Sequence, residues 1–410
     1  MMQTKITYLS LWVLLILFSA CDKKMMQYDF VIRCKTPDMY LYSPNYGAVL
    51  AVSDANGNIL EVFDIKSNET DIERTLKVDE NIQHCNLHLA FRPDNHVVYI
   101  YSHLEVQNGS FIEFEPEKKT EANLSTQKVI RVEGIQYYDT LGLLGVPYLQ
   151  SGHNAGDTYA STSSHFSPNQ GAVLVGRAVG TSEYRYLYLP DSIMASFSWD
   201  YFVNWDQFKP VPAPKSVTIA PEFPPVLSMN VDAITSDLKH YVSIGPGQKA
   251  IPSSLEFIHP VETPQALRIQ LLGDHYAAER IFQEGESLEF AMTNMKIGDI
   301  SATPGKGFKI STSGDIDLLE VVCNESTYYE WNIVGKPGSF QDATMPNLTE
   351  IYSQVQAVPS YPTPFWRFKV IAHQYDKYNY ADIKEGKHVN SGNIFYAADG
   401  GYFRIEVSHE

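Results

Sequence analysis

The sequence predicts a mainly β protein of tandem β-sandwich-like domains with one or two short helices. From Phe30 onward apolar and polar residues alternate with a period of two, as they do in half-buried strands. The chain also contains 26 Tyr, 20 Phe, 25 Gly and 23 Pro, a composition typical of strands joined by many turns. The pattern has no βαβ rhythm, which argues against a parallel α/β fold.

The chain begins with an apolar run over residues 6–20, preceded by Lys5 as its only charge. This length fits a signal peptide and is shorter than the roughly 20 residues that span a bilayer. The run ends in Leu17-Phe18-Ser19-Ala20-Cys21, which resembles the lipobox of bacterial lipoproteins, with Phe18 where Leu is usual. The alternative is an ordinary cleaved signal followed by an incidental cysteine.

The lipobox resemblance implies that residues 1–20 are a signal peptide and that Cys21 carries acyl chains such as palmitate. Residues 21–29 would then be a lipidated tether, and the protein would lie in the cell envelope, at the outer rather than the inner membrane. The membrane is thus an expected partner. A net charge of −17 and a pI near 5.1 argue against nucleic acid as a further partner, because proteins that bind nucleic acid need a basic surface.

Residues 30–208 are expected to form an N-terminal β-rich region, which the irregular stretch 134–166 divides into two β units. Asn56-Gly57 lies between two apolar runs and predicts a hairpin with a type I′ turn. The spacing around it does not fit a calcium-binding loop, because the glycine and the final acidic residue are misplaced. Ser167–Leu174 matches Ser43–Leu50 at seven of eight positions, which indicates either a duplication or convergence on one turn-and-strand pattern.

Apolar residues recur at i, i+4 spacing between Asp191 and Phe208 and predict a helix that ends before Pro210. Six prolines in residues 209–226 indicate an extended linker. Residues 227–410 return to the strand pattern and are expected to form a C-terminal β-rich domain. Asp274–Phe282 is expected to be a second, short helix.

Several candidate chemical sites are weak. Beyond Cys21, the cysteines Cys34, Cys85 and Cys323 show no CxxC pattern, so buried thiols are favoured over a Cys34–Cys85 disulfide. His84 and His88 have zinc spacing for a helix, but their surroundings alternate as in a strand, which separates the two rings by about 13 Å. We expect neither metal nor cofactor.

Asp315 and Asp317 would lie about 7 Å apart on one face of a strand, a separation seen for the carboxylates of inverting glycosidases. Such pairs usually come from different strands, however, and a turn followed by a solvated strand face is the favoured interpretation. Common catalytic motifs such as Gly-x-Ser-x-Gly and His-Glu-x-x-His are absent from the sequence.

The segment Phe197–Phe208 combines aromatic rings with Asp, Asn and Gln, a mixture that suits sugars. Its candidate ligand-binding residues are Trp199, Asp200, Trp205 and Asp206. The alternative is that the rings dock a helix onto a sheet. The sequence therefore favours a non-catalytic module that binds a glycan or an envelope protein; an assembly or adhesin subunit and an extracellular polymer hydrolase are the alternatives.

Overall fold

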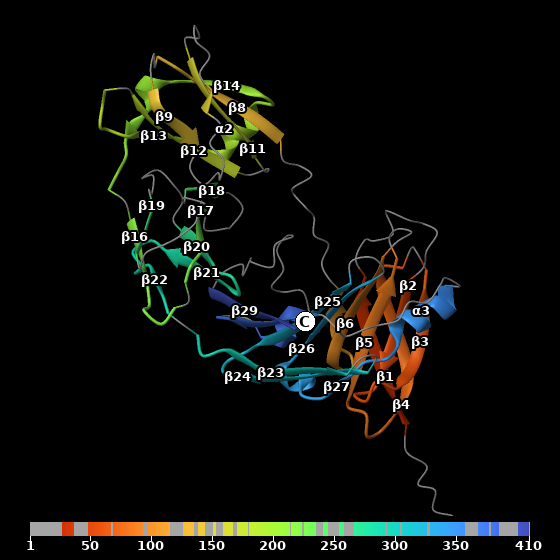
Figure 1. Cartoon of the computed structure of the whole chain (residues 1–410). Helices are drawn as coiled ribbons and strands as arrows, with labels where there is room; N and C mark the ends of the chain where they lie inside the picture. The colour runs from red at the N-terminus through yellow and green to blue at the C-terminus, as the bar shows by residue number, and fades with distance from the viewer. Residues whose placement is uncertain are drawn as a thin grey trace, which may run out of the picture.

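The computed structural model describes residues 27–36, 48–66, 69–92, 97–114, 126–134, 138–143, 151–152, 159–166, 170–178, 180–213, 215–223, 225–234, 241–244, 254–257, 266–291, 293–303, 306–325, 329–356, 368–376, 379–384 and 401–409. These residues are mostly strands with a few short helices, so the mainly β prediction is confirmed (Figure 1). Cys21 and the expected signal peptide lie outside the described residues.

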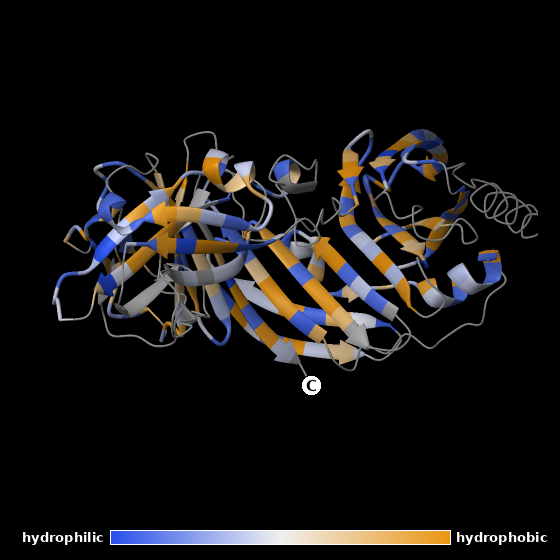
Figure 2. Cartoon of the chain, turned by 90° about the horizontal axis from the view of Figure 1, so that it is seen from above, coloured by the Kyte–Doolittle hydropathy of each residue, from blue (hydrophilic) through white to orange (hydrophobic). Residues whose placement is uncertain are grey.

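One large sheet runs through the whole molecule. In spatial order its strands are β15 (Lys209–Pro210), β13 (Arg185–Leu189), β12 (Gln170–Ala178), β18 (Tyr241–Ser243), β17 (Ser228–Ile234), β20 (Ala266–Leu272), β21 (Tyr276–Gln283), β29 (Gly401–His409), β28 (Phe368–Tyr375), β25 (Leu318–Glu325), β26 (Tyr329–Gly335), β6 (Val98–Gln107), β5 (His84–Phe91), β2 (Ala48–Ser53) and β3 (Ile59–Ile65), with β9 (Tyr138–Leu143) pairing to β12. The hydropathy colours alternate along many of these strands (Figure 2), as a period of two requires.

Four smaller sheets accompany it. They are β4 (Asp71–Asp79), β1 (Gln27–Lys35) and β7 (Phe111–Glu113); β10 (Ser151–Gly152), β11 (Tyr159–Phe166), β8 (Thr126–Glu133) and β14 (Asp200–Asn204); β19 (Ser254–Phe257), β16 (Lys215–Ile219) and β22 (Glu289–Phe290); and β23 (Lys296–Thr303), β24 (Gly307–Ser313) and β27 (Ala343–Thr344). The helices are α2 (Asp191–Ser196), α3 (Leu348–Gln356) and α4 (Tyr380–Lys384), with the 3₁₀ turns η3 (Trp205–Gln207) and η4 (Pro337–Phe340).

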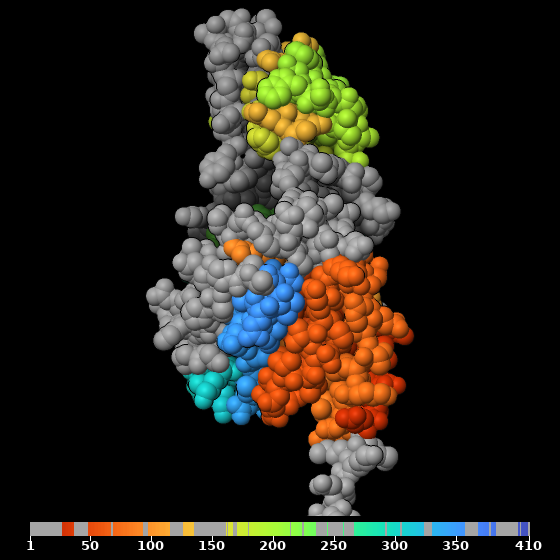
Figure 3. Space-filling model, turned by 90° about the vertical axis from the view of Figure 1, so that its right-hand side faces the viewer, coloured from red at the N-terminus to blue at the C-terminus, as the bar shows by residue number. Residues whose placement is uncertain are grey.

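Three apolar cores hold these layers together. Phe30 of β1 and Leu50 of β2 belong to a core between the β4–β1–β7 sheet and one face of the large sheet. The neighbouring Val49 points to the opposite face and joins the largest core, because successive side chains alternate across a strand. The helix α3 lies against the β2 and β5 strands on that face (Figure 3). The third core includes Ile130 of β8 and Leu174 of β12.

A parallel ladder joins distant parts of the chain inside the large sheet. Residues 98–103 of β6 pair with residues 329–334 of β26. The expected boundary at 209–226 therefore does not separate two sheets, and this proline-rich segment itself contains the short strands β15 and β16. The sandwich-like units share one continuous sheet, so they are not simply arranged in series.

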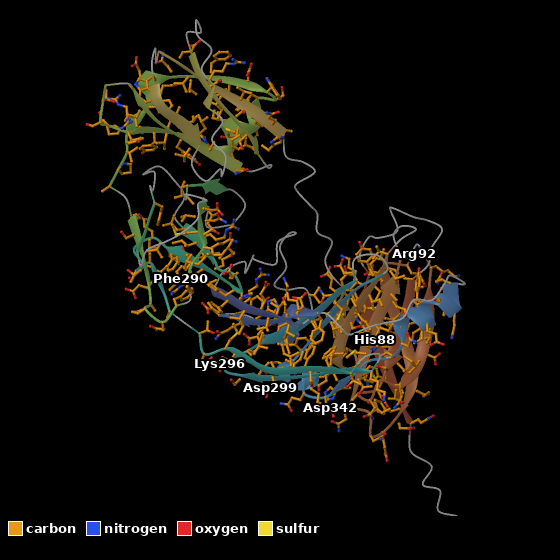
Figure 4. All side chains as sticks on the ribbon, viewed as in Figure 1. His88, Arg92, Phe290, Lys296, Asp299 and Asp342 are labelled. Atoms are coloured by element: carbon orange, nitrogen blue, oxygen red, sulfur yellow. The ribbon has the colours of Figure 1, made fainter. Side chains whose placement is uncertain are left out.

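A buried chain of hydrogen bonds crosses this junction. Trp331 Nε1 donates to Ser102 Oγ over 2.8 Å. Ser102 Oγ lies 2.8 Å from His88 Nδ1, and His88 Nε2 lies 2.9 Å from Ser53 Oγ. His88, labelled in Figure 4, is 0% exposed. The bonds therefore link β26, β6, β5 and β2 within the largest core.

The proton positions in this chain follow from its two ends. The Ser53 hydroxyl donates to the Asp54 carbonyl over 3.2 Å, so it accepts from His88 Nε2. A neutral imidazole that donates from Nε2 accepts at Nδ1, so the Ser102 hydroxyl donates to His88 Nδ1 and accepts from the Trp331 indole N–H. Burial lowers the pKa of His88 to about 3, which keeps the ring neutral as this arrangement requires.

The hairpin predicted at Asn56-Gly57 is confirmed by the antiparallel pairing of β2 and β3, but its turn is not of type I′. Among the described residues only Gly57 of the two has a positive φ, at 76°. The Asp54 carboxylate instead accepts from the backbone N–H groups of Asn56 and Asn58, over 2.9 and 2.8 Å. A side chain at position 57 would also meet Thr344 at 3.0 Å, so glycine is required there.

Both predicted helices need correction. The helix expected over 191–208 ends at Ser196, and the chain continues as β14 and η3. Residues four apart share a face in a strand as well as in a helix, so the i, i+4 pattern did not distinguish the two. The helix expected over 274–282 is the strand β21, in which Tyr276, Ala278 and Phe282 face the largest core.

The described parts of the two similar segments, residues 48–50 and 170–174, both lie in inner strands. The strand β2 pairs antiparallel with β3 and β5, whereas β12 pairs antiparallel with β13 and β9 and in parallel with β18. Val49 and Val173 face the largest core, whereas Leu50 and Leu174 each face the local core of their own unit. This equivalence favours duplication, although convergence on one strand pattern would place the residues in the same way.

The cysteines follow the favoured expectation. Cys34, Cys85 and Cys323 are buried free thiols, and burial raises the pKa of each to about 12. Thiols in such surroundings are unreactive.

We predict that Ser102→Ala destabilises the protein by about 1–3 kcal/mol, because it leaves Trp331 Nε1 and His88 Nδ1 buried without their shared partner. Urea unfolding followed by tryptophan fluorescence would measure the loss. Ser216→Ala on the exposed side of β16 is the control and should change little. Equal stability of the two variants would contradict a structural role for the chain.

Candidate functional site

The strand β14 places the predicted site residues at the edge of a small sheet. It pairs in parallel with β8 from Asp200 opposite Val129 to Asn204 opposite Glu133, and β14 is the last strand of that sheet. The Val129 N–H also donates to the Trp199 carbonyl over 2.7 Å, which continues the ladder one residue before the strand begins. The backbone of Trp199 is therefore held in place.

Alternation along β14 divides its side chains between the core and the surface. Tyr201 and Val203 pack on the third core, where the Tyr201 ring stacks on Phe197 with centroids 4.9 Å apart. Asp200, Phe202 and Asn204 are exposed on the outer face.

Two large aromatic rings lie exposed at this edge. Trp199 is 51% exposed and Phe202 is 52% exposed, the highest values among the large hydrophobic side chains that the structure describes. Both rings lie near one edge of the small sheet and are available for contact with a ligand.

An ion pair lies beside the Phe202 ring. Arg131 of β8 is directly opposite Phe202 in the register. Its guanidinium carbon lies 5.8 Å from the centre of the Phe202 ring, and its Nη2 lies 3.1 Å from Asp200 Oδ2. Both charged side chains are partly shielded from solvent, with 22% and 34% exposure. The site thus combines apolar ring faces with planar groups that donate and accept hydrogen bonds, and we call Arg131, Trp199, Asp200 and Phe202 the edge site.

The next strand leaves room beside the edge site. Ser161 of β11 lies opposite Arg131, and Ser163 lies opposite Val129. Both serines are partly exposed, and their short hydroxyl side chains rise less above the sheet than the neighbouring arginine. The polar surface therefore extends from β14 across β8 onto β11.

On the inner face of β8, Lys128 secures the turn that leads to Trp199. Its Nζ donates to the carbonyls of Met194 and Phe197, the latter over 2.8 Å, and lies 4.7 Å from the centre of the Phe197 ring. These carbonyls lie at the end of α2, where a cation is favourable. Burial lowers the pKa of Lys128.

The other two predicted residues lie apart from this group. Trp205 is half-buried in the third core, with its ring centroid 4.6 Å from that of Phe208. Asp206 is exposed in η3, where its backbone N–H donates to Asn204 Oδ1 over 2.9 Å. Trp205 follows Trp199 by six positions, and extended chain of this length spans roughly 20 Å. Trp199 and Asp200 therefore lie at the start of β14, whereas Trp205 and Asp206 lie beyond its other end.

The carboxylate pair proposed for hydrolysis lies in the connection between β24 and β25, so the expectation that it occupies one strand face is wrong. Asp315 is exposed and accepts from Asn294 Nδ2 over 3.1 Å. Asp317 accepts from the Tyr375 backbone N–H over 2.9 Å, and burial raises its pKa. Both carboxylates support loop structure.

The histidine pair lies on a strand, as the alternation predicted. His84 is exposed at the start of β5, whereas His88 is enclosed in the core. Across the described ranges no group of three or more His, Cys, Asp or Glu side chains is arranged to hold a metal ion.

Sequence reasoning missed Arg131 as part of the edge site. It lies 69 residues before Asp200, and only the parallel pairing of β8 with β14 brings the two together. Phe202 was within the aromatic segment, but a helical reading of residues 191–208 gave it no special position. Reading the same residues as a strand would have separated Phe202 from the inward-facing Tyr201 and Val203.

Comparison with known proteins adds little. No family model matches the sequence, and no curated protein matches it. One solved structure with weak likeness is the Escherichia coli alpha-2-macroglobulin activated by porcine elastase, with 10% identity and a TM-score of 0.14. That match covers 85% of this chain and 42% of the other, so the chain spans less than half the length of that protein. A score this low supports no conclusion about fold or function.

None of the helices within the described ranges combines the length and the apolarity needed to cross a bilayer.

We predict that Lys128→Met destabilises the protein by about 1–3 kcal/mol, because the carbonyls of Met194 and Phe197 lose their donor. Chemical unfolding would give the size of the effect, and hydrogen exchange should locate faster opening at residues 194–204. Lys215→Met, which removes an exposed lysine from β16, should leave both measurements unchanged. Uniformly unchanged exchange in the Lys128 variant would show that the turn does not depend on it.

Proposed function

We propose that this protein is a lipid-anchored component of the cell envelope that binds a glycan through the edge site. The observation that carries the proposal is the exposed Phe202 ring beside the Arg131–Asp200 ion pair, with the exposed Trp199 ring immediately before Asp200 in the chain. In this proposal the acylated Cys21 attaches the chain to a membrane, and the glycan is a polymer outside that membrane.

The chemistry of a sugar matches each part of the edge site. A pyranose ring has an apolar C–H face that packs on an aromatic ring, and its rim carries hydroxyls that need donors and acceptors. Arg131 supplies donors and Asp200 supplies acceptors, in a position fixed by their mutual ion pair. The exposed Asn204 and the partly exposed Ser161 add further neutral partners on the same face.

Binding without catalysis fits this arrangement better than hydrolysis. Glycoside hydrolysis requires a carboxylic acid and a second carboxylate across the scissile bond. The edge site has one carboxylate, Asp200, and this group is paired with Arg131. Asp315 and Asp317 belong to a loop in which both carboxylates already accept hydrogen bonds.

We predict that Trp199→Ala combined with Phe202→Ala reduces retention in native gels containing envelope polysaccharide by at least tenfold, since each ring contributes the packing surface for a sugar. Isothermal titration with the retaining polysaccharide would measure the change in affinity. Thermal unfolding should be unaltered, because both side chains are exposed.

Phe111→Ala provides a matched control, because Phe111 is an exposed ring on β7 in a different sheet. It should retain full binding. Unchanged retention in the double variant would reject the glycan proposal. If the double variant lost binding to an envelope protein and kept its retention by polysaccharide, the edge site would be assigned to protein recognition.

We further predict that Cys21→Ser releases the protein from the membrane fraction, because the acyl chains are joined to the cysteine sulfur. Ultracentrifugation of cell extracts and radiolabelled palmitate incorporation would test this. Cys34→Ser is the control for loss of a thiol and should stay in the membrane fraction with its label. Persistence of the Cys21 variant in washed membranes would contradict a lipid anchor at this residue.

A further inference from the structure

The junction between β21 and β29 connects the two ends of the large sheet. Residues 276–280 of β21 pair with residues 401–405 of β29 in five register positions. On one side of this ladder lie β20 and β17, and on the other lie β28, β25 and β26 (Figure 1). Loosening this ladder would uncouple the end of the large sheet that contains β12 and β13 from the end that contains β5 and β6.

One face of the junction contains a buried acid. The opposite face of β21 packs into the largest core through Tyr276, Ala278 and Phe282. Glu279 points away from this core and is only 2% exposed. In the register it lies between Gln270 of β20 and Tyr402 of β29. An acid in this place acts directly on the two strands whose pairing forms the junction.

Glu279 is only partly satisfied by its surroundings. Gln270 Nε2 donates to Glu279 Oε2 over 2.6 Å. The other oxygen, Oε1, is shielded from solvent and accepts no hydrogen bond in the part of the chain that the structure describes. A buried carboxylate oxygen without a donor strongly disfavours the ionised form.

The neighbouring charges do not remove this penalty. Arg268 of β20 donates through Nε to Asp232 Oδ2 of β17 over 3.1 Å, and both side chains are buried. This ion pair is already neutral, so ionised Glu279 adds an uncompensated negative charge near Asp232. Arg404 of β29 lies on the same face, with its backbone opposite Ala277, two residues from Glu279 along β21. The other charged groups that the register places on this face beyond Arg404 are already paired: Lys369 with Glu406, and His373 with Glu320.

We propose that Glu279 is a protonation switch that keeps the β21–β29 junction closed when it is protonated and loosens the junction when it ionises.

The direction of the pH effect follows from the two states. Burial raises the pKa of Glu279 to about 7; Arg268 and the Gln270 hydrogen bond oppose this rise, and Asp232 adds to it. In an opened junction the carboxyl returns to its ordinary pKa near 4.5. Between these values the closed form binds more protons than the open form, so closure weakens as pH rises and the effect levels off above pH 7.

Hydrogen exchange of the purified chain, followed by mass spectrometry from pH 5 to pH 8, tests the switch. After correction for intrinsic exchange rates, opening of β21 and β29 should increase on the order of tenfold per pH unit up to pH 7. Glu279→Gln keeps the size and the hydrogen-bonding capacity of the side chain but cannot ionise. Its opening should be independent of pH, whereas Glu284→Gln, in the exposed turn after β21, should behave like the native chain.

A second variant keeps the test decisive if Glu279→Gln does not fold. Asp232→Asn frees Arg268 to pair with Glu279, so ionisation becomes easier and the rise in opening should end at a lower pH. Opening that is independent of pH in the native chain would overturn the proposal. So would the native pH profile in Glu279→Gln, or an unshifted profile in Asp232→Asn.

Discussion

The parallel ladder between β6 and β26 is the constraint on which the architecture depends. It joins residues 98–103 to residues 329–334, so strands from the first and last parts of the chain share one sheet. Side-chain hydrogen bonds from Trp331 through Ser102 to His88 fix the register from within the core. Such pairing closes a very long loop and is entropically unfavourable until the surrounding core has formed.

Strand type was readable from the sequence, whereas strand partnership was not. Alternation predicted β5, β6 and β26 correctly, because a strand with one more apolar and one more polar face shows a period of two. No local pattern specifies that β26 pairs with β6. The helix expected over 191–208 failed for a related reason: its apolar positions 193, 197, 201 and 205 are four apart, and that spacing places side chains on one face of a strand as well as of a helix.

The edge site shows the same division. Trp199 and Asp200 were selected from residue type alone, because their segment combines aromatic rings with Asp, Asn and Gln. Arg131 was not recognisable, because its role depends on a parallel neighbour 69 residues away. Lys128 was equally hidden: a lysine on a strand is normally exposed, and only the turn after α2 supplies the carbonyls that compensate its burial.

The repeated segment has a consequence for how the chain reaches this fold. Ser43–Leu50 and Ser167–Leu174 share seven of eight residues, and the described residues of both lie in inner strands of one sheet. During folding each strand is therefore a competitor for the neighbours of the other, and local sequence does not discriminate between them. The flanking segments must do so: the tight turn at Gly57 delivers β3 to β2 within a few residues, before any distant strand can arrive. Early closure of the β2–β3 hairpin would thus disfavour the exchange of these two strands, within one chain or between two copies.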